Sequence, residues 1–292
     1  MDLSSTRLFT VIILIAAFVF TSCSKDNYIQ RGDSLPEAYR KSMRLFQEGD
    51  YSEAVKAFET VFSLGRGTEY ARNAQYFLAE SHFNNKNYLM AASEYERYSS
   101  LYPRSDKSEE VEFKEAYCYY KLSPRYRLDQ KYTRRALEKF NLFVSNHPNS
   151  ERLQEIAKYE DELREKLARK IYNAADLYMR IDEYEAAAIY YGLTIDQYPE
   201  TQWAERALVD QINAYNVYAE NSVSNKQEER YQKAVASYEK YLQLFPNGEH
   251  RSQAEEYVDE ARVALAQFRD TSSPDSSSTS TTTASNTPRN ER

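Results

Sequence analysis

Apolar residues recur with helical spacing over most of this chain, from about residue 35 to about residue 268. One pattern appears five times: an aromatic residue, an alanine three positions later and a second aromatic residue four positions further on, with Thr133 replacing the first aromatic residue in one copy. The copies are Tyr51/Ala54/Phe58, Tyr88/Ala91/Tyr95, Thr133/Ala136/Phe140, Tyr184/Ala187/Tyr191 and Tyr231/Ala234/Tyr238. Offsets of three and four put these side chains on one stripe of a helix, and the small alanine lets a second helix approach closely. The pattern therefore predicts repeated pairs of packed helices.

Prolines follow four of the five copies at a constant distance, twelve residues after the alanine. They are Pro103, Pro148, Pro199 and Pro246. Because proline cannot continue a helix and restricts the residue before it, each of these helices is expected to end at the same point of its repeat. Such a helix is typical of the second half of a tetratricopeptide repeat, a helical hairpin of about 34 residues. We predict an all-α tetratricopeptide-repeat solenoid of five helical hairpins plus a C-terminal capping helix.

The expected solenoid covers residues 34–269, and its repeats are unequal in length. The predicted repeats are about 35–66, 68–103, 105–148, 150–199 and 201–246, followed by a cap at 250–269. The central alanines are 37 residues apart at first and then 45, 51 and 47. Polar loops are expected at 123–130 and 220–229. Residues 151–181 contain neither glycine nor proline, which predicts one long helix, on the order of 45 Å, joining the two halves of the array.

The N-terminus has the pattern of an export signal. Residues 8–20 form an apolar run of 13 after Arg7, which is shorter than the roughly 20 residues that a membrane-spanning helix needs. The run leads into Phe-Thr-Ser-Cys, which resembles a bacterial lipobox ending at Cys23. We predict a lipoprotein signal peptide at 1–22, lipidation of Cys23 and a polar tether at 23–33; an ordinary cleaved signal or a short anchor are the alternatives. By resemblance to known lipoprotein sorting, aspartate directly after the cysteine implies retention in the inner membrane. Ser24 stands at that position here, so we expect an outer-membrane location, and the face of that membrane is left open.

Composition narrows the classes of partner. The formal net charge is −7, the pI is about 5.3, and no run of lysine or arginine stands out, so we expect no nucleic-acid partner. The 27 tyrosines suit a thin two-helix layer, since a tyrosine can be half-buried with its hydroxyl in water. Residues 270–292 are mostly serine, threonine, proline and asparagine, which predicts a disordered tail.

No catalytic or metal-binding arrangement is visible in the sequence. The histidines, His82, His147 and His250, fall in different repeats, whereas such sites need several groups to converge. After lipidation of Cys23, Cys118 is the only thiol left, and it lies in an apolar helix. We expect a protein with no enzymatic activity, no cofactor and no metal.

A tetratricopeptide array binds extended or helical segments along a concave face lined by the first helix of each repeat. The residues expected to face inward in the first two repeats are Tyr39, Met43, Phe46, Tyr76, Glu80 and Phe83. The alternative is that these side chains pack between repeats. If exposed, aromatic residues at the free end of the stack would suit a peptide with an aromatic terminus.

The order of irregular spacings resembles one family. Over about residues 20–265 the chain resembles the BamD family of β-barrel assembly lipoproteins. The resemblance lies in the lipobox, two near-standard repeats, the segment LDQKYTRRALEKFNLFVSNHPNS, the long helix and the pair Ala207-Leu208 before Ala214-Tyr215. The resemblance implies a lipid-anchored protein on the periplasmic face of the outer membrane. It further implies that the C-terminal repeats bind the POTRA region of the barrel-forming subunit and that the N-terminal repeats bind the C-terminal segment of unfolded outer-membrane proteins.

Carried over by position, the resemblance assigns residues to both functions. The substrate region is the groove given above, and the partner region lies around Tyr190, Trp203, Arg206 and Asn213. The C-terminal insertion and the serine-threonine tail depart from the family pattern. Other outer-membrane tetratricopeptide lipoproteins are the alternatives: an adaptor associated with peptidoglycan or pili, or a glycan-uptake protein, which would need a longer chain and more tryptophan than Trp203.

Overall fold

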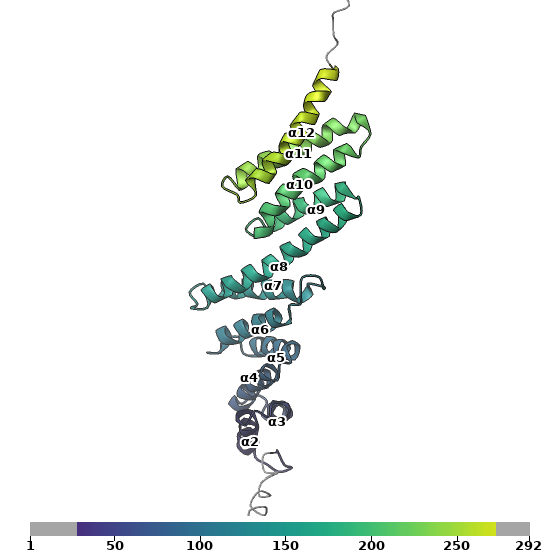
Figure 1. Cartoon of the computed structure of the whole chain (residues 1–292). Helices are drawn as coiled ribbons and strands as arrows, with labels where there is room; N and C mark the ends of the chain where they lie inside the picture. The colour runs from purple at the N-terminus through teal and green to yellow at the C-terminus, as the bar shows by residue number, and fades with distance from the viewer. Residues whose placement is uncertain (1–27, 273–292) are drawn as a thin grey trace, which may run out of the picture. The chain divides into compact units, whose positions relative to one another are not determined.

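The computed structural model describes residues 28–272, with side chains to Arg269, and the regular secondary structure of this part of the chain is all α-helix (Figure 1). The helices are α2 (Leu35–Gln47), α3 (Tyr51–Leu64), α4 (Glu69–Asn84), α5 (Tyr88–Leu101), α6 (Ser108–Leu122), α7 (Lys131–Asn146), α8 (Leu153–Arg180), α9 (Tyr184–Gln197), α10 (Gln202–Glu220), α11 (Ser224–Leu244) and α12 (Arg251–Ser272). Consecutive helices pack against each other from α2 to α7 and from α9 to α12, and α12 packs on both α10 and α11. The predicted all-α tetratricopeptide-repeat fold is confirmed.

The chain divides into two compact units, one ending at Leu163 and the other beginning at Arg164. The boundary falls inside α8, so the first unit holds α2 to α7 with the start of α8, and the second holds the rest of α8 with α9 to α12. The first unit has two buried clusters, one around Phe58 and one around Tyr95 and Phe140. The second unit has a cluster around Leu208 and Tyr241.

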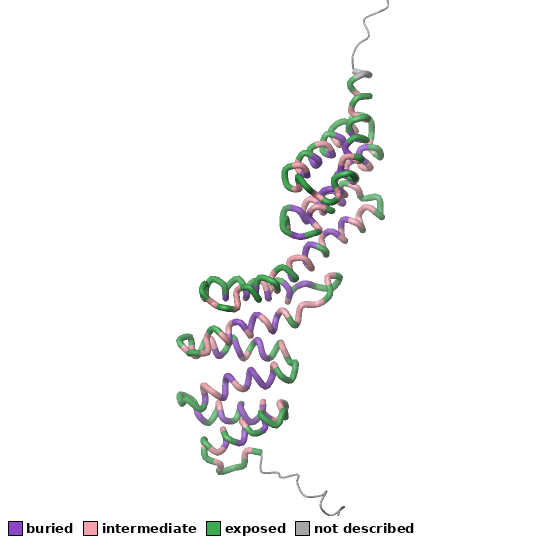
Figure 2. The backbone as a smooth tube through the Cα atoms, turned by 60° about the vertical axis from the view of Figure 1, so that its left-hand side comes forward, coloured by how far each residue is buried: buried purple, intermediate pink, exposed green. Residues whose placement is uncertain are grey.

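The five central alanines of the sequence pattern lie in the packed interior. Ala54, Ala91, Ala136, Ala187 and Ala234 are all 0% exposed. Buried positions recur along the helices at the spacing that the pattern predicts (Figure 2). A larger side chain at any of these positions would have to displace the neighbouring helix.

The four prolines end helices as predicted. Before each proline, the chain leaves the helix through one residue with φ between −127° and −139° and ψ between 56° and 62°. These residues are Tyr102, His147, Tyr198 and Phe245. The proline ring excludes the helical conformation at the residue before it, so the exit geometry is repeated.

Local sequence also fixes where helices begin. Pro36 stands in the first turn of α2, where the missing N–H would have no partner. The Asp50 carboxylate accepts a hydrogen bond from the Glu53 N–H at the start of α3, and the Thr68 hydroxyl accepts one from the Ala71 N–H at the start of α4. Gly49, with φ of +82°, supplies the left-handed residue in the turn before α3.

One of the two predicted loops is wrong. Residues 123–130 lie between α6 and α7 as expected, but 224–229, predicted as loop, form the start of α11. This segment is rich in glutamate, glutamine and lysine, which favour helix, and Glu229 pairs with both Lys226 (3.4 Å) and Lys233 (3.3 Å) one turn away. The extra residues of the fifth repeat therefore lengthen its helices. The helix predicted at 151–181 corresponds to α8.

The chain ends differ from expectation in part. Ile29, in the predicted tether, packs against the first buried cluster, and Asp33 pairs with Lys41 at 2.9 Å. At the other end α12 continues to Ser272, so the first three residues of the predicted tail, 270–272, are helical. The signal peptide, Cys23 and the remaining tail lie outside the described residues. Among the helices within 28–272, none has the length and apolar character needed to cross a membrane.

Candidate functional site

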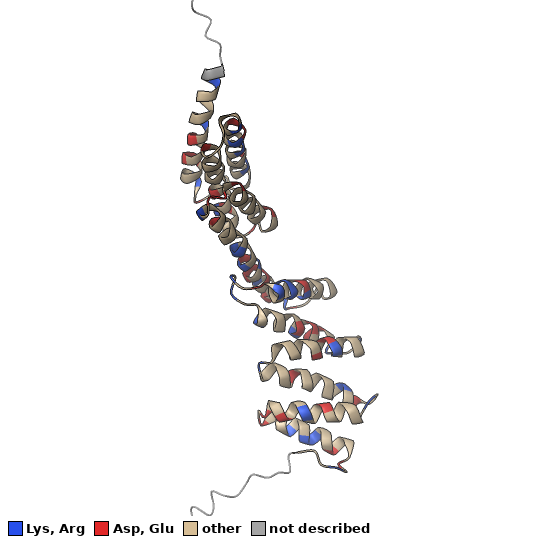
Figure 3. Cartoon of the chain, turned by 90° about the vertical axis from the view of Figure 1, so that its right-hand side faces the viewer, with Lys and Arg blue, Asp and Glu red and all other residues tan. Residues whose placement is uncertain are grey.

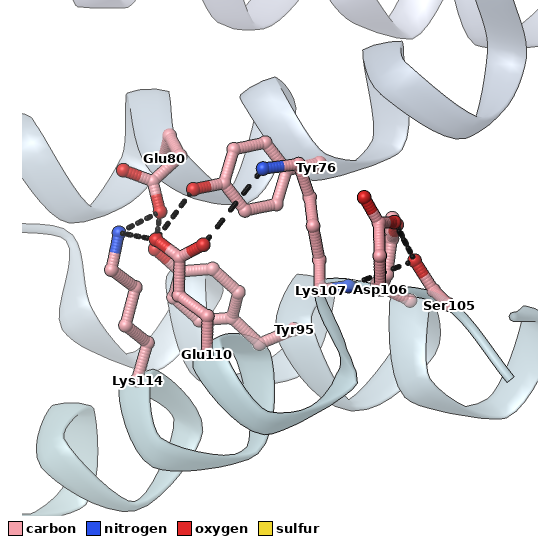
Figure 4. A network of polar contacts seen from close by, with 9 residues as sticks. Tyr76, Glu80, Tyr95, Ser105, Asp106, Lys107, Glu110 and Lys114 are labelled. Carbon is pink, nitrogen blue, oxygen red and sulfur yellow. Dashed lines mark hydrogen bonds and ion pairs between the residues drawn. The ribbon is translucent and has the colours of Figure 1, made fainter. Parts of the chain in front are cut away.

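The first unit contains a polar network between α4 and α6, which are the first helices of two successive hairpins, and one residue of α5 joins it (Figure 4). Glu80 on α4 is only 9% exposed and accepts hydrogen bonds from Tyr95 Oη (2.5 Å) and Lys114 Nζ (2.6 Å). Lys114 also lies 3.1 Å from Glu110, and Glu110 accepts a hydrogen bond from Tyr76 Oη at 2.8 Å. The network thus connects three helices of two successive repeats.

Burial and hydrogen bonding set the protonation of this network. Burial opposes ionisation of Glu110, but hydrogen bonds from Tyr76 and Lys114 outweigh it and keep the pKa of Glu110 below its usual value. Burial, reinforced by the negative charge of Glu80, raises the pKa of Tyr76 and of Tyr95. The two phenols therefore remain protonated donors at neutral pH, which fixes the direction of their hydrogen bonds.

Beside this network, half-buried aromatic rings form a continuous row, here called the aromatic ladder: Phe83, Tyr117, Tyr120 and Tyr159. Ring centroids are 6.2 Å apart for Phe83 and Tyr117, 5.4 Å for Tyr117 and Tyr159, and 4.5 Å for Tyr120 and Tyr159. The rings belong to α4, α6 and α8, the helices expected to line the binding face. Their partial exposure offers apolar contact to an extended segment or to an aromatic side chain.

Acidic side chains hold two rings of the ladder in place. Tyr120 Oη donates to Glu162 at 2.5 Å, and Tyr159 Oη donates to Glu155 at 2.7 Å. The hydrogen bond to Glu162, with burial, raises the pKa of Tyr120 to about 12. These rings are thus fixed before any ligand arrives, which lowers the entropic cost of binding.

Sequence reasoning missed Tyr117, Tyr120 and Tyr159. A signal for the first of them was present, because Tyr117 lies 34 residues after Phe83, at the equivalent position of the next repeat. Tyr159 could not be found in this way, since the loop at 123–130 and the altered fourth repeat shift the register.

Of the six residues predicted to line the groove, two are buried and four are half-buried. Tyr76 and Glu80 are 7% and 9% exposed and belong to the buried network, as the alternative interpretation expects. Tyr39, Met43 and Phe46 are half-buried on the first cluster, and Phe83 begins the aromatic ladder. A role of these residues in substrate binding stays a prediction.

In the second unit, α10 carries three of the four predicted partner residues on one stripe. Trp203, Arg206 and Asn213 are spaced by three and seven positions, which places them on the same side of a helix. The ring centroids of Trp203 and Tyr172 lie 5.0 Å apart, and the Arg206 guanidinium lies 5.9 Å from the centroid of the Trp203 ring. The fourth residue, Tyr190, lies on α9 and contacts Tyr178 on α8 at 4.8 Å.

A pocket of about 700 Å³ adjoins this stripe, lined in part by Arg206, Phe245 and His250. Glu205 organises its wall by accepting hydrogen bonds from Tyr241 Oη (2.9 Å) and from the His250 N–H (2.8 Å). The pocket combines a cation, an apolar ring and a carboxylate, which suits a partner side chain with both apolar and polar parts. Sequence gave no signal for His250, which is 44 residues from Arg206.

A smaller cavity of about 120 Å³ lies between Arg206, Asp210 and His250. Asp210 accepts a hydrogen bond from Tyr172, and burial raises its pKa above the usual value. Within residues 28–272 no group of three or more histidine, cysteine, aspartate or glutamate side chains is placed to hold a metal ion. Cys118 is 0% exposed, and burial raises the pKa of its thiol, so it behaves as a core residue.

Comparison with known proteins finds a matching family model and several related proteins. The YfiO family model, described as an outer membrane lipoprotein, matches residues 32–230. The outer membrane protein assembly factor BamD of Pasteurella multocida is 26% identical over 224 residues, covering 73% of this chain and 86% of that protein. BamD of Caulobacter vibrioides is 24% identical over 177 residues, covering 61% of this chain and 58% of that protein. The crystal structure of a TPR repeats protein from Bacteroides fragilis aligns with a TM-score of 0.44 and 13% identity, covering 79% of this chain and 99% of that one.

Proposed function

Because this chain belongs to the YfiO family of outer membrane lipoproteins, whose BamD relatives are assembly factors, we propose that it is a non-enzymatic assembly factor for outer-membrane proteins. It acts by binding and positioning other proteins, with no covalent step. Its mature form is anchored to the outer membrane, facing the periplasm, through a lipid on Cys23.

The second unit is the proposed docking site for the POTRA region of the barrel-forming subunit. The observation that carries this assignment is the α10 stripe, where Trp203 and Arg206 lie together beside the 700 Å³ pocket. Tryptophan and arginine contribute strongly to interfaces because each combines a large contact area with a polar group. Tyr190 and Asn213 would extend the contact from α9 and α10.

The aromatic ladder of the first unit is the proposed site for the C-terminal segment of unfolded outer-membrane proteins. Its rings are partly exposed and already held in place by Glu155 and Glu162, and the half-buried Tyr39, Met43 and Phe46 lie at the start of the same unit. A terminal aromatic side chain would stack on this ladder. Holding the segment near the insertion machinery would shift that machinery towards the conformation that accepts it.

Affinity purification from gently solubilised envelopes tests partner binding. We expect a POTRA-bearing barrel protein in the eluate of the wild type, a much smaller amount with Trp203→Ala or Arg206→Glu, and no change with Lys226→Glu, an exposed cation of the same unit. The proposal fails if no such barrel protein elutes with the wild type. Recovery of peptidoglycan, pilus or glycan-uptake proteins in its place would support the alternative adaptor.

Substrate binding is tested separately with a labelled peptide from the last strand of an outer-membrane barrel that ends in phenylalanine. Tyr117→Ala and Tyr159→Ala should each weaken binding by about five- to tenfold, the range for a loss of one aromatic contact. Leu89→Ala, at an exposed apolar residue of the neighbouring helix α5, is the matched control. Equal affinity of wild type and both tyrosine variants would remove the ladder from the proposed site.

A further inference from the structure

The loop between α6 and α7 is held in a fixed shape by a buried glutamine. Gln130 is 0% exposed, and its side-chain N–H groups donate to the carbonyls of Arg125 (2.9 Å) and Leu128 (3.0 Å). Its carbonyl accepts a hydrogen bond from the Thr133 hydroxyl at 2.6 Å. The Leu128 N–H also bonds to the Arg125 carbonyl at 3.0 Å, which closes a turn. The loop therefore presents its outer side chains from a rigid base.

Basic residues gather on this loop and on the helix ends that flank it, as the blue segments in Figure 3 show. Residues 121–135 contain six lysines and arginines but one acid, Asp129, which gives a local charge of 6 − 1 = +5 in a chain of net charge −7. The six are Lys121, Arg125, Arg127, Lys131, Arg134 and Arg135. Tyrosine, leucine and other residues separate them, so they do not form an uninterrupted run in the sequence.

Four of these cations are available to a partner. Arg135 is compensated by Glu138 (2.8 Å) and Glu96 (3.6 Å), and Arg134 lies 4.0 Å from Asp129. The other four are exposed, and within residues 28–272 they form no ion pair. They are Lys121, Arg125, Arg127 and Lys131.

Apolar groups lie among these cations. Leu128 is 59% exposed, and Tyr126 is half-buried with its hydroxyl accepting a hydrogen bond from Arg127 Nε at 3.0 Å. An exposed leucine and a tyrosine surrounded by arginine and lysine have the composition of segments that enter a membrane interface, where apolar side chains reach the acyl boundary and cations meet anionic headgroups. We name the four available cations with Tyr126 and Leu128 the basic turn.

We propose that the basic turn is a membrane-surface site that binds anionic phospholipid headgroups. Charge complementarity and the exposed Leu128 favour a lipid surface over an acidic protein, since an acidic protein would need the cations but not a protruding apolar residue. The site requires only that the mature protein lies at a membrane. The observations that support it are separate from those for the proposed partner and substrate sites, although Lys121 Nζ also lies 5.8 Å from the Tyr117 ring of the aromatic ladder. It would orient the first unit at the bilayer in addition to the lipid on Cys23.

Vesicle flotation of the mature chain with Cys23→Ser tests the site without the lipid anchor. We expect the protein to float with phosphatidylethanolamine vesicles that contain about 30% phosphatidylglycerol, to remain unbound with neutral vesicles, and to be released between about 50 mM and about 500 mM salt. Arg125→Glu/Arg127→Glu should lower vesicle partitioning by about tenfold or more.

The matched control is Arg66→Glu/Arg104→Glu, which makes the same change of charge in two other loops of the first unit. Arg66 and Arg104 are exposed and lie in the α3–α4 and α5–α6 loops, at the edge opposite the basic turn because successive helices are antiparallel (Figure 1). This variant should bind vesicles like the wild type. Circular dichroism should show unchanged helix content and melting for both variants.

A second variant separates insertion from charge. Leu128→Ser leaves every charge in place and should lower partitioning by about twofold to tenfold, since one apolar side chain no longer enters the interface. Equal binding to neutral and anionic vesicles, or anionic binding unaffected by Arg125→Glu/Arg127→Glu, would overturn the proposal. So would a complete lack of vesicle binding, which would leave an acidic protein as the partner of this surface.

Discussion

Lys114 Nζ lies 2.6 Å from Glu80 Oε1, although the two residues are 34 positions apart. The hydrogen bond from Tyr76 to Glu110 spans the same 34 positions. This separation is the length of one tetratricopeptide repeat, so both contacts join equivalent positions on α4 and α6. The polar network is thus an inter-repeat connection that sets how these two helices are placed side by side.

Lys114→Met should lower the free energy of unfolding by about 1–3 kcal/mol, because Glu80 would keep Tyr95 as a donor but lose its cation in a largely buried site. Urea unfolding measures this loss. Glu80→Gln/Lys114→Met should cost less than the sum of the single changes. Arg40→Met, at an exposed ion pair with Glu37, is the control and should cost less than about 1 kcal/mol. Strict additivity would show that Glu80 and Lys114 do not stabilise each other.

In the second and fourth repeats the second aromatic residue of the pattern is a tyrosine, and an acid lies 15 positions earlier. Tyr95 donates to Glu80 and Tyr191 to Asp176, both across 15 residues. In the first repeat the aromatic residue is Phe58, and the residue 15 positions earlier is Met43. A buried hydroxyl needs a partner, which the preceding helix supplies to Tyr95 and Tyr191. Tyr238 of the fifth repeat instead reaches Glu255 of the following helix at 3.5 Å.

Phe58→Tyr should therefore destabilise the first hairpin by about 1–3 kcal/mol, because the new hydroxyl would face Met43 without a partner. Met43→Glu/Phe58→Tyr should recover part of this loss by recreating the pair found in the second and fourth repeats. Thermal melting of the two variants and of Met43→Glu alone measures the effect. No recovery in the double variant would contradict the proposed pairing rule.

Ala91→Leu should cost about 1–3 kcal/mol by overpacking the contact between helices, since Ala91 is 0% exposed. Ser93→Leu, at an exposed position of the same helix, should change stability by less than about 0.5 kcal/mol. The melting temperatures of the two variants compare the sites directly. Equal melting would mean that the alanine is not the point of closest approach.

Stability should fall between about pH 7.5 and pH 5.5 through His82. Burial lowers the pKa of this histidine below its ordinary value of about 6.5, and its Nδ1 has no hydrogen-bond partner among residues 28–272. Below pH 6.5 the unfolded chain then binds a proton that the folded chain resists, so acidification favours unfolding until the folded pKa is reached. In urea unfolding at both pH values, His82→Gln should lose less stability than the wild type. An identical loss would exclude His82 as the cause.

Cys23→Ala should release the protein from the membrane without changing its fold, because the acyl chains rather than any described helix would provide the anchor. Fractionation of cells followed by a wash at high salt measures this, and the salt also removes electrostatic binding by the basic turn. Retention of the variant in the washed membrane fraction would argue against lipid anchoring. Circular dichroism of the released protein checks that its helices are intact.

The class of fold and the ends of many helices could be predicted from local features of the sequence. Three- and four-residue offsets around Ala91 and Ala187, and prolines at a constant distance after them, are local features that act through helix geometry. In the fifth repeat the polarity of residues 224–229 predicts a loop, but these residues form the first part of α11. Polar residues on the solvent face of a helix cannot be told from loop residues by hydropathy alone.

The burial or exposure of the candidate residues follows from contacts between helices, which the sequence pattern does not specify. Tyr76 and Glu80 have the spacing of groove residues, yet contacts with Glu110, Lys114 and Tyr95 on other helices bury them. The ladder needs Tyr159 from α8, which the irregular loop lengths bring beside Tyr117 and Tyr120. The basic turn depends on the hydrogen bonds that Gln130 makes to the loop carbonyls. Burial and convergence depend on contacts between residues distant in sequence, and a periodic pattern specifies only the face of one helix.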